Sequence, residues 1–160
     1  MQYMFQGCNR LTSLDVSNFD TSNVSQFEYM FDTNFQFDTL DISNFDFSKV
    51  TGSGYGKGIT DIFRFYTLLT NLSFGNNFGK GFTSKSANNS YSKWGLSRNT
   101  NLTHDSLMDV INKLYDLNLT YNVASGGKLY SQQLVLGTTN LAKLSEEEIA
   151  IATNKGWTVS

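Results

Sequence analysis

Leu14-Asp15-Val16-Ser17-Asn18-Phe19-Asp20 is the stretch of this sequence that determines the fold, because the chain repeats it. Leu40-Asp41-Ile42-Ser43-Asn44-Phe45-Asp46 follows 26 residues later with one conservative change. The match extends upstream, where Met4-Phe5 becomes Met30-Phe31. A unit of this length cannot bury its own apolar side, so neighbouring units must stack to share a core. The sequence therefore predicts a solenoid.

The residue types within one unit predict its geometry. Leu14 and Val16 are two residues apart, so in a strand both side chains point to one face. Asn18 and Asp20 flank Phe19 and can hydrogen-bond local backbone in a tight turn. A short helix is predicted next, because apolar residues recur at helical spacing: Val24, Phe27, Met30 and Phe31. One strand, one turn and one short helix per unit is the plan of a leucine-rich repeat.

Two stretches carry a family resemblance. Phe5-Gln6-Gly7-Cys8-Asn9-Arg10-Leu11-Thr12-Ser13-Leu14-Asp15-Val16-Ser17-Asn18-Phe19-Asp20-Thr21-Ser22-Asn23-Val24 resembles the BspA-like leucine-rich repeats of bacterial surface proteins. The stretch from Asn101-Leu102-Thr103-His104-Asp105-Ser106-Leu107 to Lys155-Gly156-Trp157 resembles the closing segment often found after such repeats. The resemblance implies an α/β leucine-rich-repeat solenoid with short parallel strands on one face, short helices on the other, and a helical C-terminal cap. Members are mostly surface-exposed or phage-borne binding proteins, so a binding function is implied, without a ligand.

Residues 1–100 are predicted to hold the repeats. Two are clear, at residues 4–29 and about 30–61, and one or two degenerate ones follow from Ile62 onward. Two segments interrupt this pattern, which are a Gly-rich insertion at residues 51–58 and a polar loop at residues 79–93.

Residues 101–160 form a predicted capping segment with two helices. Thr103 suits the N-cap of a helix over about 103–117, and Ser145 with Glu148 forms a capping box for a second helix over about 145–155. Between them, residues 119–127 read as a loop or short hairpin. Strands are predicted where apolar residues stand two apart, at Leu134 and Leu136 and at Trp157 and Val159.

Composition limits the possible functions. The 160 residues are 39% hydrophobic and 16% charged, which suits one globular domain. A formal net charge of −2 without a long basic run argues against general nucleic-acid binding. No segment resembles a membrane span or a secretory signal. Two locations fit: a bacterial cell surface or phage particle if the chain belongs to a longer secreted protein, or the cytoplasm if it is complete as given.

No catalytic, metal or cofactor site is expected. His104 is the only histidine, and nothing in the spacing pairs it with a nucleophile. Clustered His, Cys or carboxylate ligands for a metal are missing from the sequence pattern. Gly56-Lys57-Gly58-Ile59 lacks the Ser or Thr that would follow Lys in a phosphate-binding loop. The chain is therefore predicted not to be an enzyme.

The candidate binding surface has two parts. Asp15 and Asp41 recur at the same outward position and could hold a cation or a basic group, or could simply be a solvated consensus. Aromatic residues in the polar loop could bind a ligand, or could fold back over the core. The full candidate set is Asp15, Ser17, Asp41, Ser43, Ser73, Tyr55, Lys57, Phe82, Tyr91 and Trp94.

Two functions remain open at this point. The first is a non-catalytic module of a bacterial surface or phage protein that recognises a protein or a glycan. The alternative is a small phage-encoded intracellular protein that inhibits a host macromolecule by covering its surface. The N-terminal end of the solenoid is also predicted to be covered, because the Leu14 strand has a neighbour on one side only. A second copy, a partner, or more of a longer chain could cover it.

Overall fold

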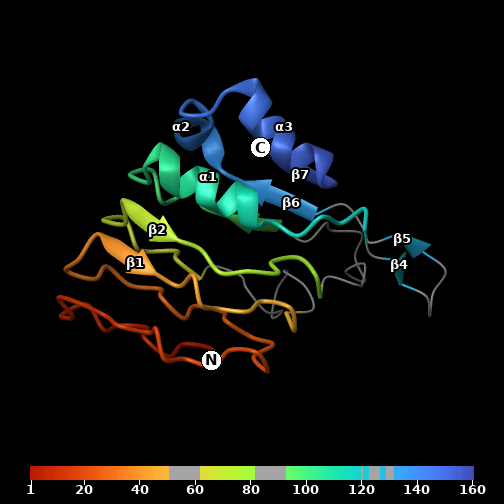
Figure 1. The fold of residues 1–160 in the computed structure, drawn as a ribbon. Helices are drawn as coiled ribbons and strands as arrows, with labels where there is room; N and C mark the ends of the chain where they lie inside the picture. The colour runs from red at the N-terminus through yellow and green to blue at the C-terminus, as the bar shows by residue number, and fades with distance from the viewer. Residues whose placement is uncertain (51–61, 82–92, 120, 123–126, 129–131) are drawn as a thin grey trace.

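Successive segments of the chain lie one above another. A computed structural model describes residues 1–50, 62–81, 93–119, 121–122, 127–128 and 132–160. In Figure 1 the segments 4–29, 30–50 and 62–81 are stacked from the N-terminal end upward, and we call them the first, second and third coils. Residues 93–119 and 132–160 continue the stack to the end where the C-terminus lies.

Backbone hydrogen bonds join neighbouring coils at equivalent places. Phe5 N donates to Met30 O, and Phe31 N donates to Ile62 O, each at 3.0 Å. These bonds connect the first coil to the second and the second to the third, so the 26-residue repeat sets the register of the first step and the longer second repeat that of the next.

A two-stranded parallel sheet forms one long side of the stack, which we call the β1 side. β1 (Thr39–Asp41) pairs with β2 (Asn71–Ser73), and Leu40 lies opposite Leu72. The alternation of exposed and buried residues in both strands points Leu40 and Leu72 into the core.

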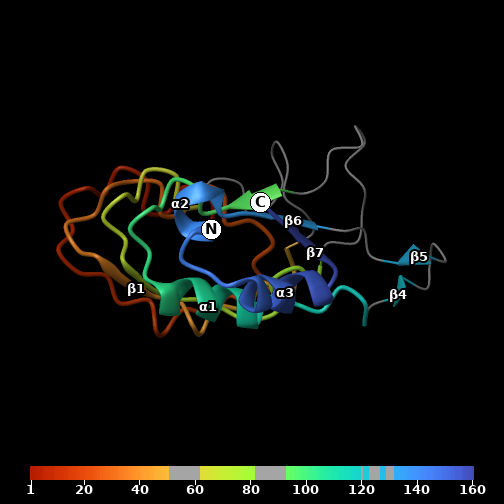
Figure 2. The same cartoon turned by 90° about the horizontal axis from the view of Figure 1, so that it is seen from above.

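Helix α1 (His104–Lys113) takes the place of a third strand on the β1 side. Two of its side chains accept the strand's hydrogen bonds: Ser106 Oγ accepts from Leu72 N at 2.8 Å, and Asp109 Oδ2 accepts from Phe74 N at 2.5 Å. Helix α3 (Glu146–Asn154) packs on α1, so the same side is helical from there on (Figure 2).

A second parallel sheet lies away from β1 and contains the later strands. Its order is β3 (Lys93–Gly95), β6 (Gln132–Val135) and β7 (Trp157–Val159). The shorter elements are the antiparallel pair of β4 (Tyr121–Asn122) and β5 (Gly127–Lys128) and the helix α2 (Gly137–Leu141).

The short helices predicted opposite the strands are not formed in the described part of residues 1–100, and α1 and α3 lie in the segment predicted as the C-terminal cap. The helices α1 and α3 continue the side that β1 and β2 begin. The reason lies in the side-chain spacing: Leu107, Val110 and Ile111 are buried at helical spacing, whereas Leu40 and Ile42 alternate.

The first coil also lacks its predicted strand and helix. Residues 13–17 do not form a strand, and residues 21–31 form turns without a helix. Thr21 Oγ1 accepts a hydrogen bond from Asp46 N of the second coil at 2.7 Å. Val24 N donates to Thr21 O at 2.9 Å and closes a turn. The Thr21 hydroxyl, which could cap a helix, is therefore used in a hydrogen bond between coils.

The C-terminal helices begin at their capping residues. Thr103 is the N-cap of α1, and Ser145 and Glu148 form a capping box at the start of α3. α1 ends at Lys113, four residues earlier than the predicted 117, although Leu117 is buried. Gly156 follows α3 with φ of 85°, the left-handed conformation that suits glycine after a helix.

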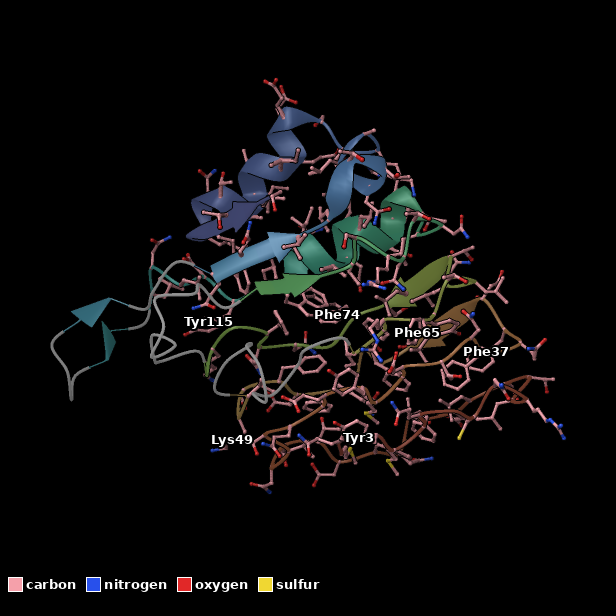
Figure 3. The ribbon with its side chains drawn as sticks, turned by 180° about the vertical axis from the view of Figure 1, so that it is seen from behind. Tyr3, Phe37, Lys49, Phe65, Phe74 and Tyr115 are labelled. Atoms are coloured by element: carbon pink, nitrogen blue, oxygen red, sulfur yellow. The ribbon has the colours of Figure 1, made fainter. Side chains whose placement is uncertain are left out.

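Stacked aromatic rings fill the core along the axis of the stack. Phe5, Phe31 and Phe63 form one column, with ring centroids 5.7 Å apart at both steps. Phe74, labelled in Figure 3, stacks on Trp94 at 5.0 Å. Each ring contributes both buried area and stacking energy, so the column joins coils that share few strand bonds.

Candidate functional site

The predicted aromatic binding surface is not formed by Trp94, because this ring is part of the core. Trp94 is 2% exposed and lies 5.0 Å from the Phe74 ring and 4.5 Å from the Phe78 ring, measured between centroids. The alternative, in which the aromatic residue folds back over the core, holds for this position. The other predicted residues from the insertion and the polar loop lie outside the described residues: Tyr55, Lys57, Phe82 and Tyr91.

The predicted polar row consists of Asp15, Ser17, Asp41, Ser43 and Ser73, of which Asp41 and Ser73 face each other across β1 and β2. Their carboxylates are used locally: Asp15 Oδ1 accepts from Ser17 N, and Asp41 Oδ1 accepts from Ser43 N, each at 2.9 Å. The bond from the Ser17 backbone lowers the pKa of Asp15. The row therefore closes its own turns and carries no evidence of a ligand.

Metal binding finds no support among the described residues. No group of three or more His, Cys, Asp or Glu side chains that could hold an ion occurs in that part of the chain. Nor does the described part contain a helix long and apolar enough to cross a bilayer.

An exposed aromatic strip connects the start of the chain and the end of the first coil with the third coil. We use this name for Tyr3, Tyr29, Arg64 and Phe65. The Tyr3 and Tyr29 rings stack at 5.1 Å, and the Arg64 guanidinium lies 4.9 Å from the Tyr29 centroid and 4.5 Å from the Phe65 centroid. Tyr3 and Phe65, labelled in Figure 3, are 50% and 48% exposed.

Apolar residues beside the strip enlarge this surface along the chain. Met4 follows Tyr3 and is 47% exposed, and Leu68 lies three residues after Phe65 and is 48% exposed. The large hydrophobic side chains that the described part of the protein leaves exposed are Tyr3, Met4, Phe65, Leu68 and Leu119. Met4 and Leu68 thus lie close in sequence to the exposed members of the strip, whereas single exposed apolar residues need no explanation.

A buried carboxylate fixes the arginine of the strip. The Asp32 side chain is 1% exposed and accepts from Arg64 Nη2 at 2.9 Å and from Arg64 Nε at 3.3 Å. Gln6 Nε2 also donates to Asp32 Oδ2 at 3.2 Å. Gln6 and Asp32 are 26 residues apart, so the three side chains form a ladder across three coils. A two-point bond of this kind holds the planar guanidinium in one orientation.

The backbone at the two tyrosines is unusual. Tyr3 has φ of 58° and Tyr29 has φ of 54°, in the left-handed region that bulky residues rarely adopt. Such a conformation costs of the order of 1 kcal/mol or more and persists where the surroundings impose it. Because it occurs in the residue directly before the first coil and in the residue directly before the second, the strain recurs with the 26-residue repeat.

Sequence reasoning missed the strip, although part of the signal was present. Tyr3 and Tyr29 recur with the 26-residue period next to the Met-Phe pair that defined the repeat. Arg64 follows the longer second repeat and so does not stand at the 26-residue spacing. Only its contact with Asp32 reveals it. A search for aromatic residues that recur at repeat spacing would have identified the first two members.

The strip offers a partner ring edges and a charged planar group. Tyr3 and Arg64 both contact the Tyr29 ring, at 5.1 Å between ring centroids and at 4.9 Å from the guanidinium to the centroid. Tyrosine and arginine are enriched at the energetic centres of protein interfaces. Since Arg64 is already oriented, little further side-chain entropy is lost on binding.

Comparison with known proteins adds one finding, which concerns the part of the chain that carries Tyr3 and Tyr29. Residues 1–55 match a protein-family model. The family is described as Mycoplasma protein of unknown function, DUF285. The match covers about a third of the 160 residues. No curated protein and no solved structure matches the chain. The comparison therefore supports the relationship of the first two coils to this family and gives no ligand.

Proposed function

We propose that this protein is a leucine-rich-repeat solenoid of the BspA-like kind, that it catalyses no reaction, and that it serves as a recognition module of a bacterial surface or phage protein. The 26-residue repeat, the stacked coils and the family match over residues 1–55 support this proposal. The observation that carries it is the aromatic strip of Tyr3, Tyr29, Arg64 and Phe65.

A protein partner fits the strip better than a glycan does. The Tyr29 ring stacks on Tyr3 and lies 4.9 Å from the Arg64 guanidinium, so it offers a sugar less open ring face than an isolated tyrosine does. The strip leaves accessible the half-exposed rings of Tyr3 and Phe65, the apolar side chains of Met4 and Leu68, and an oriented guanidinium. Apolar side chains and backbone carbonyls of another protein complement these groups, and such contacts form the centre of many interfaces.

Retention of partner proteins by an immobilised chain tests this proposal. Extracts of the source cell and of the cells it contacts are passed over the wild type and over a variant with Tyr3→Ser and Phe65→Ser. Both residues are about half exposed, so the variant should keep its fold, which circular dichroism checks. We expect proteins retained by the wild type to be lost from the variant.

The matched control changes the polar row instead. A variant with Asp41→Ala and Ser73→Ala alters two exposed positions on the β1 side, and it should retain the same proteins as the wild type. If the control variant no longer retains the proteins and the strip variant still does, the binding surface lies on the β1 side. Retention by all three would show that neither surface is used.

A further inference from the structure

In the described chain each later coil packs against the coil before it, whereas the first coil leaves the corresponding surface uncovered. We infer that this surface is a docking site for one further coil built on the same 26-residue pattern. We call it the first-coil face, and define it by the apolar residues Phe5, Leu14, Phe19 and Val24 with the polar groups of Gln2, Met4, Arg10, Asn18 and Asp20. The inference does not depend on the aromatic strip.

Burial at equivalent positions shows what is missing from this face. Phe5, Leu14, Phe19 and Val24 are only partly buried. The residues 26 positions later are between 0% and 1% exposed: Phe31, Leu40, Phe45 and Val50. The side chains are of the same type, so the difference arises from the layer that the first coil supplies to the second. The face therefore continues an interface that already exists inside the molecule.

A hydrogen-bonding group on the face also lacks the partners that its equivalent in the second coil has. Asn44 Nδ2 donates to the carbonyls of Val16, Ser17 and Phe19 at 3.1–3.2 Å, which ties the second coil to the turn of the first. Asn18 is the equivalent residue of the first coil. Its amide has no hydrogen bond with any described residue, so it is available to three carbonyl groups of a preceding turn.

The backbone supplies four more matching positions. Asp46 N donates to Thr21 Oγ1, and Gln36 N donates to Leu11 O, so Asp20 N and Arg10 N are the corresponding donors of the first coil. Glu28 O and Met30 O accept from Tyr3 N and Phe5 N, so Gln2 O and Met4 O are the corresponding acceptors. Within the described residues these four groups of the first coil have no partner. Only a chain of the same pattern presents all the complementary groups together.

A second folded copy of this chain does not supply that surface by head-to-tail stacking. The side of its first coil that would fit is covered by its own second coil. At its other end lie α3 and the edge strand β7 instead of the turns that carry Leu11 O and Thr21 Oγ1, so that end does not repeat the surface that the first coil offers to the second. The occupant is therefore a coil whose matching side is free.

The test adds such a coil to the chain. A copy of residues 1–29 is joined directly to Met4 of the full chain, which reproduces the natural junction of Tyr29 with Met30. Hydrogen exchange of the Asp20 amide in the original coil is the readout, because this group gains a Thr hydroxyl acceptor only when the added coil docks. We expect exchange to slow by about tenfold or more, and the melting temperature to rise by several degrees.

Two controls make the result specific. An added copy with Leu14→Ser and Phe19→Ser cannot pack, so it should leave Asp20 exchange and the melting temperature unchanged. Asn18→Ala in the original coil should leave the unextended chain unaffected and remove part of the gain in the extended chain. The Asp46 amide, bonded in both chains, serves as the internal reference.

Three outcomes would overturn the inference. Asp20 exchange that is as fast in the extended chain as in the original would show that the added coil does not dock. A separate melting transition for the added coil, with the original unchanged, would show the same. If the unextended chain is a dimer that Phe5→Lys converts to a monomer, a second copy covers the face instead.

Discussion

At the scale of single residues, asparagine side chains tie the turns of successive coils together. Asn44 reaches three carbonyl groups of the first coil, and Asn140 Nδ2 donates to Leu96 O and Asn99 O at 3.0 and 3.3 Å. Several of these carbonyls also accept a backbone N–H within their own turn, such as Val16 O from Phe19 N and Leu96 O from Asn99 N. One planar amide therefore adds a second layer of hydrogen bonds that joins a turn of one coil to the next.

Asn99→Ala should test this role most directly. Asn99 is buried, and its Nδ2 donates to Phe63 O at 3.1 Å and to Tyr66 O at 2.9 Å. Removing the amide deletes two hydrogen bonds at a buried site, although Phe63 O and Tyr66 O each keep a backbone donor, so we expect a loss of about 1–3 kcal/mol of unfolding free energy. Urea denaturation measures it. Asn101→Ala is the control, since Asn101 is exposed and bonds only Thr67 O in the described chain, and an equal loss in both variants would contradict the prediction.

Leu40→Ala should destabilise the protein far more than Asp41→Ala. Leu40 is 1% exposed in the core, and its truncation should cost about 2–5 kcal/mol through lost burial and a cavity. Asp41 is exposed and gives up one bond to Ser43 N, worth about 1 kcal/mol. Chemical denaturation of both variants decides the matter, and equal midpoints would contradict the assignment of Leu40 to the inner face of β1.

The pattern of residues predicted inward and outward positions better than it predicted their partners. Alternation at Leu40 and Ile42 predicts burial because a strand has only two faces. Trp94 was assigned to a polar loop, since nothing in its sequence neighbours indicates the rings of Phe74 and Phe78, against which it packs. The asparagine bonds were missed because their acceptors are backbone carbonyls, which every residue carries.

At the scale of elements, one ionic contact joins the starts of α1 and α3. His104 Nε2 lies 2.8 Å from Glu148 Oε1, and His104 Nδ1 lies 3.3 Å from Asp105 Oδ1. The hydrogen bond to Glu148, followed by that to Asp105, raises the pKa of His104 above its ordinary value of 6.5. The Ser145 backbone bond, followed by the His104 bond, lowers the pKa of Glu148 below 4.5.

These directions set the pH window in which the contact acts. A raised histidine pKa means that the contribution of His104 is complete below 6.5 and is lost as the pH rises through the raised value. A lowered carboxyl pKa means that the contribution of Glu148 is present above 4.5 and is lost as the pH falls through the lowered value. The contact therefore stabilises the α1–α3 junction most at mildly acidic pH.

His104→Gln should accordingly reduce stability more at about pH 5.5 than at about pH 8.5. Urea denaturation of the variant and the wild type at both values measures the difference. In an NMR titration of the imidazole, Glu148→Gln should lower the pKa of His104, whereas Glu147→Gln, a change to the exposed neighbour, should alter it less. An unchanged pKa in Glu148→Gln would show that the contact does not form in solution.

Helix starts were predictable at this scale, and helix positions in the stack were not. Thr103 and Ser145 mark the starts of α1 and α3 because capping is a local interaction. The exchange of a strand for α1 beside β2 depends on Ser106 and Asp109, whose oxygens replace the carbonyls of a missing strand. No local pattern indicates that these two side chains will serve a sheet edge.

At the scale of the whole molecule, stability should increase along the phenylalanine column from its open end. Phe5 has a ring neighbour of the column on one side, Phe31, whereas Phe31 lies between Phe5 and Phe63 and is 0% exposed. In a stacked array the terminal unit has one interface and inner units have two. We therefore expect Phe31→Ala to cost about 3–5 kcal/mol, and Phe5→Ala clearly less.

Native-state hydrogen exchange provides the second measure of this gradient. The amide of Phe5 should exchange faster than the amide of Phe31, although both donate to a carbonyl of the next coil at 3.0 Å. Equal exchange rates, with equal costs of the two alanine substitutions, would show that the stack unfolds as one unit without fraying from the first coil.

Trp94 and Trp157 lie in the same part of the molecule, so tryptophan fluorescence reports on one end of the stack. Both indoles are buried against Phe78 in the later part of the stack, and they are the two tryptophans of the chain. Tyr3 and Tyr29 belong to the opposite end. Excitation at the red edge of the absorption band therefore reports on the C-terminal end alone, while tyrosine emission includes the first coils. A difference between the two signals along one denaturation curve gives the order in which the ends come apart, without a label or a substitution.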